Sequence, residues 1–490
     1  MQKKVGYFLT GAGALVALLS LSLDLFGIGQ PGIQAAQLFG AQVGILAALI
    51  GIGLIFHARS NSESIFEGIK KIFQQIPDWP LITWVLAGFL LVYVLFFIFP
   101  AFFNATSRIY YFDHYLPDKY PIGNDFLYST GALKEWLAGR NPYSLTSHYY
   151  PPLYHIIFAP FLLLGYPNDF YLITSITLAS LFLTGFILPI CMKKEANLTV
   201  LLFFLLTALF SYGLQFELER GQFNMITFTL CILAIYLFYY QPAFRYLAYV
   251  LFSISVNLKL YPLIFIVMFI KDWRDWKNNI KRLAGLGLFN LALLFVIGPD
   301  IFMKFLNALP KNNGSEVVTF PGNHSITVFV YNLAHDEYGQ LSGTLLSWLK
   351  NNSTPVSLIF FGIFGVCFLL VLYRAYRENN NGINADLLLM CTLGALMIPS
   401  SIDYKLELLA APMALALYNR EMPVKLWQKI VFALTVFSAS FAYSLTLVPY
   451  KYRLDSGIFA NSFPMLFMIL IALTILNLIS KNKKLSPASA

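Results

Sequence analysis

The chain has 490 residues, of which 58% are hydrophobic and 12% are charged, and its mean hydropathy is +0.67. Because a soluble domain carries about 25% charged residues, this composition excludes a soluble globular protein and indicates an all-α polytopic membrane protein. The formal net charge of +9 does not indicate a nucleic-acid partner, because the lysines and arginines stand in short clusters beside apolar segments, where they act as topology signals.

Apolar segments long enough to cross a bilayer recur along the whole chain. A helix of about 20 residues crosses a hydrocarbon core of about 30 Å, and irregular backbone exposed to lipid would leave polar groups unpaired. We therefore expect a bundle of about 12 to 14 transmembrane helices. The predicted crossing segments are 5–23, 37–57, 82–103, 168–191, 197–216, 221–240, 244–258, 260–271, 280–299, 355–375, 384–400, 405–418, 425–449 and 457–479.

The basic residues predict the orientation, since Lys and Arg are enriched in cytoplasmic loops. An N-terminus in the cytoplasm places every basic cluster there, provided that 153–165 does not fully cross and that the chain turns back at Lys259–Pro262. Pro152, Pro160 and Pro262 favour both conditions because proline breaks helices. The sequence thus predicts a multi-pass protein of the plasma (inner) membrane with both termini in the cytoplasm.

This topology brings four polar segments to the outer face, so a site built from them would lie at that membrane surface. The four segments are 104–152, 217–222, 300–354 and 400–405.

The first of these segments contains a predicted interfacial helix with Asn124 and Asp125 at its N-terminus. Its apolar residues fall largely on one stripe, as in helices that lie in the interface. They are Phe126, Ala132, Leu133, Trp136 and Leu137.

A series of short motifs resembles glycosyltransferase family 87, the polyprenol-phosphate-mannose-dependent mannosyltransferases. The order and approximate spacing both agree, and the resemblance covers about residues 81 to 450. The motifs are Asp125-Phe126-Leu127-Tyr128, Gly139-Arg140-Asn141-Pro142-Tyr143, Tyr150-Pro151-Pro152-Leu153, Gly221-Gln222-Phe223-Asn224, Lys259-Leu260-Tyr261-Pro262 and Asn323-His324-Ser325.

The resemblance implies a GT-C fold, a helical membrane enzyme that takes a sugar from a polyprenyl phosphate and carries its catalytic Asp in the first large outer loop. Asp125 occupies that position, and the motif residues Gln222, Asn224 and Asn323 become candidate substrate contacts. One departure is the turn 400–405, where the family often has histidines and this chain reads Ser-Ser-Ile-Asp-Tyr-Lys.

Chemistry gives Asp125 the same role independently. Direct displacement of a sugar from a lipid phosphate needs a base for the acceptor proton and a cation for the departing phosphate. Asp125, at the water boundary, is therefore the candidate general base, and one carboxylate favours inversion at the sugar carbon. The structural alternative, compatible with that role, is a helix N-cap.

Four cations on the outer face are candidates for binding the phosphate. Lys259 lies between two apolar half-helices, where an unpaired ammonium is costly unless an anion accompanies it, although a lysine can also extend to the headgroups. His324 is either a hydrogen-bond donor to phosphate or part of an exposed loop, and it also falls within a glycosylation sequon.

The other two cations have acidic neighbours in the sequence. Arg220 follows Glu217 and Glu219, so an ordinary ion-pair network is an alternative to a ligand role. Lys405 either supplies charge to the leaving group or neutralises Asp403, and we favour the latter.

Aromatic and histidine residues crowd the first outer loop. Tyr128, Tyr143 and Tyr150 are candidates for stacking against a sugar ring, but tyrosines are also the usual residues of a membrane interface. The candidates for a metal site fit no recognised ligand spacing, so we expect no metal; they are His114, His148 and His155 with Asp113 and Asp118. No Gly-rich nucleotide cradle is present, so we expect no cofactor and no sugar-nucleotide donor.

The chain divides into three predicted parts. Residues 1–80 form two additional N-terminal helices and a basic amphipathic linker, 81–480 form the GT-C-like glycosyltransferase domain, and 481–490 form a cytoplasmic tail. We expect a hexosyltransferase whose partners are a polyprenyl-phosphate sugar, a glycan or glycolipid acceptor and the bilayer.

Two other classes share parts of this pattern. A transporter or flippase of lipid-linked sugars would show broken helices in two related halves, which this sequence lacks. An oligosaccharide polymerase or ligase would have an arginine-rich outer loop late in the chain, where few arginines occur.

Overall fold

The computed structural model describes residues 2–22, 44, 79–98, 122–144, 148–192, 197–309, 322–337, 341–379, 382–418, 425–444, 458 and 461–479. Within these residues the chain is helical, and the single β-bridge joins Asn323 to Ile402. The prediction of an all-α membrane protein is therefore confirmed. The predicted span 37–57, the linker up to residue 78 and the outer residues 104–121 lie outside the described part, apart from residue 44.

The described part of the chain consists of a succession of helices, and the predicted spans within it fall on some of these helices. In the first half these are α1 (Gln2–Ser22), α4 (Leu81–Tyr93), η3 (Val94–Ile98), α7 (Asn124–Leu137), η4 (Pro142–Ser144), α8 (Leu153–Phe158), η5 (Ala159–Leu163), α9 (Asn168–Phe182), η6 (Leu183–Ile187), α10 (Leu188–Met192), α11 (Leu198–Leu209), α12 (Tyr212–Arg220) and α13 (Asn224–Tyr240). In the second half they are η7 (Pro242–Phe244), α14 (Arg245–Leu258), η8 (Tyr261–Phe269), α15 (Trp276–Leu294), α16 (Pro299–Ala308), α18 (Ile326–Ala334), α19 (Gly343–Glu378), α20 (Ala385–Met397), η10 (Asp403–Leu409), α21 (Ala410–Tyr418), α22 (Leu426–Ser444) and α24 (Phe463–Ile479).

Two of the described helices are each long and apolar enough to cross a membrane, Asn168–Met192 and Gly343–Glu378. Two further pairs pass the same test if each is one bent span, α11 with α12 (50°) and α15 with α16 (97°). The remaining apolar helices are shorter, so the predicted total of about 12 to 14 crossings stays a prediction.

Both conditions on the topology agree with the local structure. The segment 153–165 contains only α8 and the 3-10 segment η5, which ends at Leu163. The chain breaks between α14 and η8 at Lys259 and Leu260, because Pro262 stands at the start of η8.

The helices α13 and α20 form the centre of the bundle. In α20 every residue from Leu387 to Met397 is buried, and α13 is buried along most of its length. A helix that is apolar on all sides belongs either in the interior of a protein or in the membrane. Accordingly, α20 packs against α19, α21, α24 and η8, and α13 packs against α9, α14 and η8.

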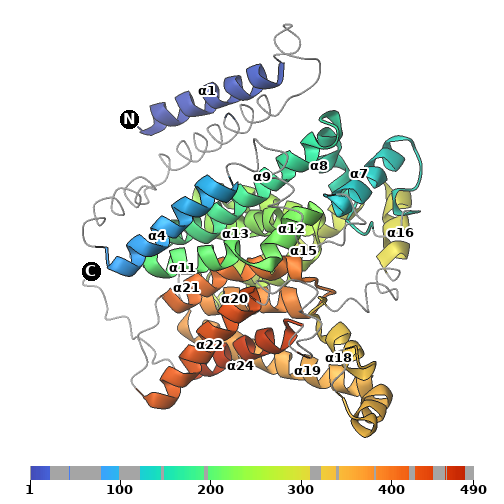
Figure 1. Cartoon of the computed structure of the whole chain (residues 1–490). Helices are drawn as coiled ribbons and strands as arrows, with labels where there is room; N and C mark the ends of the chain where they lie inside the picture. Colours follow the sequence, from blue (N-terminus) through green and yellow to red (C-terminus); the bar gives the residue numbers. More distant parts are fainter. Residues whose placement is uncertain are drawn as a thin grey trace.

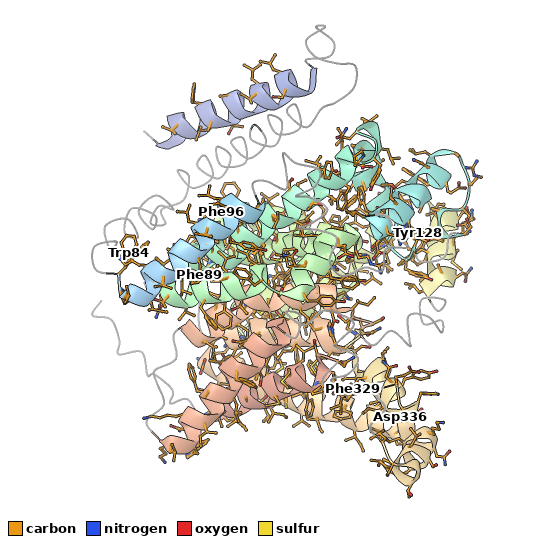
Figure 2. The ribbon with its side chains drawn as sticks, in the orientation of Figure 1. Trp84, Phe89, Phe96, Tyr128, Phe329 and Asp336 are labelled. Carbon is orange, nitrogen blue, oxygen red and sulfur yellow. The ribbon has the colours of Figure 1, made fainter. Side chains whose placement is uncertain are left out.

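The outer surface of the bundle is apolar where lipid would cover it. Trp84, Phe89 and Phe96 of α4 and η3 are exposed, and Figure 2 shows α4 at the edge of the bundle. Figure 1 shows α7, α8 and α16 together at one end of the bundle, while α1 lies apart from it beyond α4. The predicted division at residue 80 stays a prediction.

Candidate functional site

The site begins at the first turn of α7, where Asp125 stands. The helix starts after Gly123, whose N–H donates to the carbonyl of Glu219 (2.7 Å) and ties α7 to the end of α12. The N-cap position belongs to Gly123 and has no side-chain cap. The N-cap interpretation of Asp125 is therefore wrong, and its carboxylate is available for other partners.

Those partners come from the turn between α12 and α13. Arg220 Nη1 donates to Asp125 Oδ1 (3.1 Å), and Gln222 Nε2 donates to Asp125 Oδ2 (2.7 Å). The Asp125 side chain is 27% exposed, so its carboxylate is held on two sides and still reaches the surface.

Gly221 makes this turn sterically possible. Its φ of +66° is in the left-handed region, and a Cβ there would lie 2.7 Å from the Cβ of Phe126 on α7. Glycine alone accepts both the backbone conformation and the close approach without strain. The glycine thus allows α7 to lie against the turn that holds its aspartate.

Lys259 lies beneath this carboxylate and, with Gln222 and Asn224, forms the layer of the site below Asp125. Its ammonium donates to Gln222 Oε1 (2.7 Å) and to Asn224 Oδ1 (2.6 Å), and it lies 4.3 Å from the centroid of the Phe223 ring. Only 8% of the residue is exposed. Burial lowers the pKa of Lys259 to about 7, although the nearby charge of Glu217 opposes this effect.

Two of the three predicted aromatic residues support this layer. The Tyr150 hydroxyl donates to Gln222 Oε1 (3.2 Å), and its ring centroid lies 5.3 Å from the Lys259 ammonium. Tyr143 is buried and its hydroxyl donates to the Tyr150 carbonyl (2.9 Å). Tyr128 is exposed on α7, and its ring is the most accessible of the three.

The acidic residues before Arg220 are not at the surface. Glu217 and Glu219 are both 0% exposed, and Glu217 Oε1 accepts from the Met225 N–H at the start of α13 (2.9 Å). Arg220 forms its ion pair with Asp125. It therefore contacts the candidate base directly, a pairing that the sequence did not indicate.

Lys405 lies close enough to Lys259 to act on it electrostatically, and its ammonium is bonded to a group other than Asp403. Its ammonium donates to the Ser400 carbonyl (3.1 Å) and lies 5.4 Å from the Tyr261 ring centroid. Lys405 is 8% exposed and acts electrostatically on Lys259. The favoured pairing with Asp403 is wrong, because that carboxylate faces another residue.

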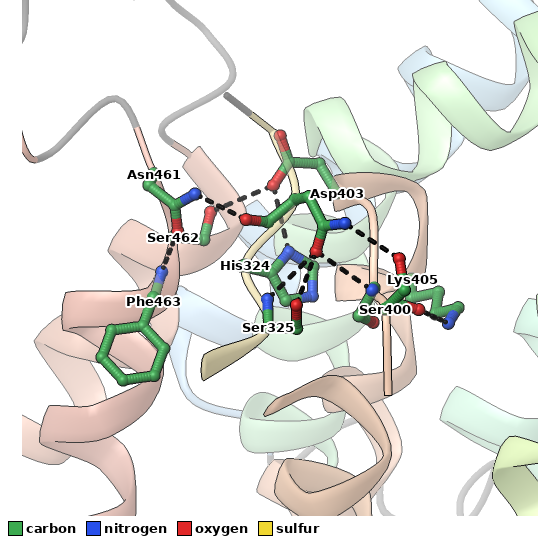
Figure 3. A network of polar contacts seen from close by, with 10 residues as sticks. His324, Ser325, Ser400, Asp403, Lys405, Asn461, Ser462 and Phe463 are labelled. Atoms are coloured by element: carbon green, nitrogen blue, oxygen red, sulfur yellow. Dashed lines mark hydrogen bonds and ion pairs between the residues drawn. The ribbon is translucent and has the colours of Figure 1, made fainter. Parts of the chain in front are cut away.

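A second polar cluster surrounds His324 (Figure 3). His324 Nδ1 lies 3.2 Å from Asp403 Oδ1, and both side chains are fully buried. The His324 backbone N–H also donates to the Ser401 carbonyl (2.8 Å). An exposed loop or a glycosylated sequon is thereby excluded, since every residue of Asn323-His324-Ser325 is buried.

Asn323 connects this second cluster to the loop that carries Lys405. Its amide donates to Ser400 Oγ (2.9 Å), and its Oδ1 accepts from the Ser401 N–H (3.1 Å). The Asn323 carbonyl accepts from Asn461 (2.8 Å). These contacts hold Asn323 to the segment 400–405 and to Asn461.

The two rings of His148 and His155 lie against each other. His148 Nε2 and His155 Nε2 are 3.2 Å apart, and both rings are buried. Burial places the pKa of His148 well below its ordinary value. Within the described residues no group of three His, Cys, Asp or Glu side chains could hold a metal ion.

Comparison with known protein families finds glycosyltransferase family 87 over residues 148–399, about half of the chain. The chain belongs to glycosyltransferase family 87. It is accordingly a membrane glycosyltransferase, with a sugar donor and an acceptor as substrates. No curated protein and no solved structure is significantly similar to the chain.

The family 87 match covers part of the site. Gln222, Lys259 and His324 lie within the matched residues, whereas Asp125 and Lys405 lie before and after them. The two outlying residues are joined to the matched part by the contacts described above, since Asp125 is bonded to Gln222 and Lys405 acts on Lys259.

Three contributors to this family 87 site were not among the predicted site residues. Phe223 lies under Lys259, Glu217 holds the start of α13, and Glu407 approaches Glu217 from η10. One local signal was present in the sequence. Gly213 stands one helical turn before Glu217, and a glycine inside a helix often has a packing reason.

Proposed function

We propose that this protein moves a hexose, mannose by its family resemblance, from a polyprenyl-phosphate sugar to a hydroxyl of a glycan or glycolipid acceptor. Asp125 is the general base, and the reaction takes place at the outer face of the plasma membrane. One observation supports this proposal above all. Asp125, Gln222 and Lys259 form a continuous chain of hydrogen bonds that sets a base beside a buried ammonium.

The exposure of the acidic side chains favours Asp125 as the base. Its side chain is 27% exposed, whereas Glu217 and Glu219 in the adjoining turn are completely buried. A general base must come within hydrogen-bond distance of the hydroxyl whose proton it takes. Among these three carboxylates, only that of Asp125 meets this requirement without a rearrangement.

The cations of the site support a lipid phosphate as the leaving group. Lys259 and Lys405 both lie below the surface on aromatic rings, and a buried ammonium is stable only near an anion. Arg220 stands on the other side of Asp125. We assign Lys259, Lys405 and Arg220 to the phosphate, and we assign His324 to holding the loop of Lys405.

The reaction balances as one displacement. The acceptor oxygen forms a bond to the sugar carbon C1, and the bond from C1 to the phosphate oxygen breaks, with its electron pair going to the phosphate. The hydroxyl proton moves to Asp125. Protonated Asp125 no longer neutralises Arg220, so the positive charge of Arg220 acts more strongly on the phosphate as negative charge builds there. A single displacement inverts the configuration at C1.

The exposed ring of Tyr128, on the helix that carries the base, is the proposed contact for the acceptor sugar. It is 45% exposed, whereas Tyr143 and Tyr150 use their hydroxyls within the protein.

The three amide residues of the motifs act by holding other groups in place. Gln222 and Asn224 accept hydrogen bonds from the Lys259 ammonium. Asn323 holds the segment 400–405 through the Ser401 N–H. We therefore propose that these residues contribute to substrate binding indirectly, by holding Lys259 and Lys405 in position.

The test is sugar transfer from a polyprenyl-phosphate sugar in membranes, comparing the wild type with Asp125→Asn. We expect the variant to lose activity by a factor of about 100 or more while the protein remains folded, since removal of a general base costs about 10²- to 10⁴-fold. Transfer at a near-normal rate by folded Asp125→Asn would exclude the assignment. A product with the donor's own anomeric configuration would exclude inversion.

A further inference from the structure

Two glutamates meet in the protein interior beneath the proposed phosphate site. Glu217 comes from α12 and Glu407 from η10, and both are 0% exposed. Gly213, one turn before Glu217, lets the two segments approach, because a Cβ there would lie 2.8 Å from the Asp403 carbonyl and 3.4 Å from Glu407 Oε2. The two carboxyl groups interact directly with each other.

Their oxygens have too few hydrogen-bond donors for two carboxylates. Glu217 Oε1 accepts from the Met225 N–H, but Glu217 Oε2 and both oxygens of Glu407 have no donor among the described residues. An ionised carboxylate only accepts hydrogen bonds, so two of them cannot satisfy one another. One proton held between them supplies one of the missing donors and removes the repulsion between two buried like charges.

This proton changes the net charge of the groups around Lys259. Those that act on its ammonium are Glu217, Lys405, Asp125 and Glu407, and Asp125 is already paired with Arg220. Two protonated lysines facing two ionised glutamates would be neutral overall. With one proton in the glutamate pair, the same groups retain a single positive charge.

We infer that Glu217 and Glu407 share one proton and thereby set the charge of the Lys259–Lys405 site to match a phosphodiester, which carries one negative charge. This inference rests on the proposed function, because it takes these lysines as the phosphate-binding cations. The two glutamates are positioning residues that do not touch the substrate. They hold the ammonium groups close to a counter-charge without cancelling the attraction for the donor.

The experiment is a double-mutant cycle with Glu217→Gln, Glu407→Gln and the double variant, measuring the KM for the polyprenyl-phosphate sugar. Each single variant keeps one carboxylate and replaces the shared proton by an amide donor, so its KM should stay within about threefold of the wild type. The double variant removes both glutamate charges from the two buried lysines, so its KM should rise by about 100-fold or more, well beyond the product of the single effects, which is at most about ninefold.

Infrared difference spectra between wild type and variants give a readout that needs no substrate. The carbonyl stretch of a protonated carboxyl group should be present in the wild type and lost in either single variant, because in both the amide takes over the donor role. Glu378→Gln, at the end of α19 and paired with Arg374 (2.7 Å), is the matched control and should leave both the band and the KM unchanged.

The outcomes separate the two proposals. An unchanged infrared band in both single variants would overturn the shared proton, and so would single variants that each raise the KM as much as the double variant. A band that behaves as expected with equal KM values in all variants would overturn the charge-setting role. Failure of the wild type to use any polyprenyl-phosphate sugar would instead overturn the proposed function, while the infrared result would still decide whether the proton is shared.

Discussion

The carboxylate of Asp125 and the ammonium of Lys259 are bonded to opposite ends of one side-chain amide, that of Gln222. The amide nitrogen donates to Asp125 (2.7 Å) and the amide oxygen accepts from Lys259 (2.7 Å). In the proposed mechanism, a base and a phosphate-binding cation are thus held at a fixed separation by a neutral group. A charged group at this position would repel one of the two.

This geometry predicts that Gln222→Glu is more harmful than Gln222→Met. The glutamate keeps the shape but places a second carboxylate against Asp125 and removes its donor, whereas methionine only removes the two hydrogen bonds. We expect kcat/KM to fall about tenfold for Met and about 100-fold for Glu, because unsatisfied charged groups cost more than neutral ones. Transfer assays on purified protein measure both. Equal losses in the two variants would contradict a bridging role.

The lowered pKa of Lys259 predicts a pH dependence of donor binding. With a pKa of about 7, the ammonium is present below that pH and is lost as the pH rises through it. The KM for the donor should therefore increase by about tenfold per pH unit on the alkaline side. At saturating donor the rate should change less, because bound phosphate stabilises the ammonium.

The control for this pH dependence is Lys259→Met, which should have a high KM at every pH. A wild-type KM that stays constant across the neutral range would show that Lys259 does not titrate in the donor-free enzyme, or that its charge does not contribute to binding.

Gly221 predicts a stability effect with a matched control in the same chain. Gly221→Ala combines a φ of +66° with a Cβ at 2.7 Å from Phe126, and such strain costs about 1–3 kcal/mol. Gly365→Ala in α19 meets nothing within 4 Å and should be neutral or slightly stabilising, as alanine favours a helix. Thermal unfolding in detergent measures the difference. A Tm of Gly221→Ala equal to that of Gly365→Ala would refute the steric argument.

Hydropathy and basic clusters predicted most of the described helices, because burial in lipid demands long apolar segments with paired backbone groups. The break at Lys259 and Leu260 was also predicted, since Pro262 cannot continue a helix. The site residues were predicted individually from residue type and motif. Their contacts were not predictable, because Asp125 and Arg220 are 95 residues apart and no local pattern encodes a pairing over that distance.

The same limit applies to the partners of Arg220 and Lys405. In the sequence, both cations have acidic residues close by. In the structure, however, Glu217 is buried and Asp403 contacts His324. Short charged segments at a membrane surface contain several possible pairs, and the choice among them is made by how distant helices pack. Burial of Glu217 follows from the contact of α12 with η10, which the sequence does not show.

His324 joins two segments that are far apart in the sequence. Its ring is fully buried against Asp403, and its backbone N–H donates to the Ser401 carbonyl (2.8 Å). Lys405 lies on one of these segments, but its ammonium belongs to the proposed phosphate site. We therefore expect His324 to contribute to stability and Lys405 to contribute to donor binding.

Replacing His324 should affect mainly the stability of the protein, whereas replacing Lys405 should affect mainly the KM for the donor. His324→Gln should lower the free energy of unfolding by about 1–3 kcal/mol, since it leaves a buried carboxylate poorly paired, while its donor KM, measured well below the Tm, should change less than about threefold. Lys405→Met should raise the KM by about tenfold or more with little change in Tm, because it removes a cation that stabilises the phosphate. His335→Gln, an exposed histidine after α18, serves as the control for both readouts. A large KM increase in His324→Gln at unchanged Tm would mean that this histidine contacts the phosphate itself.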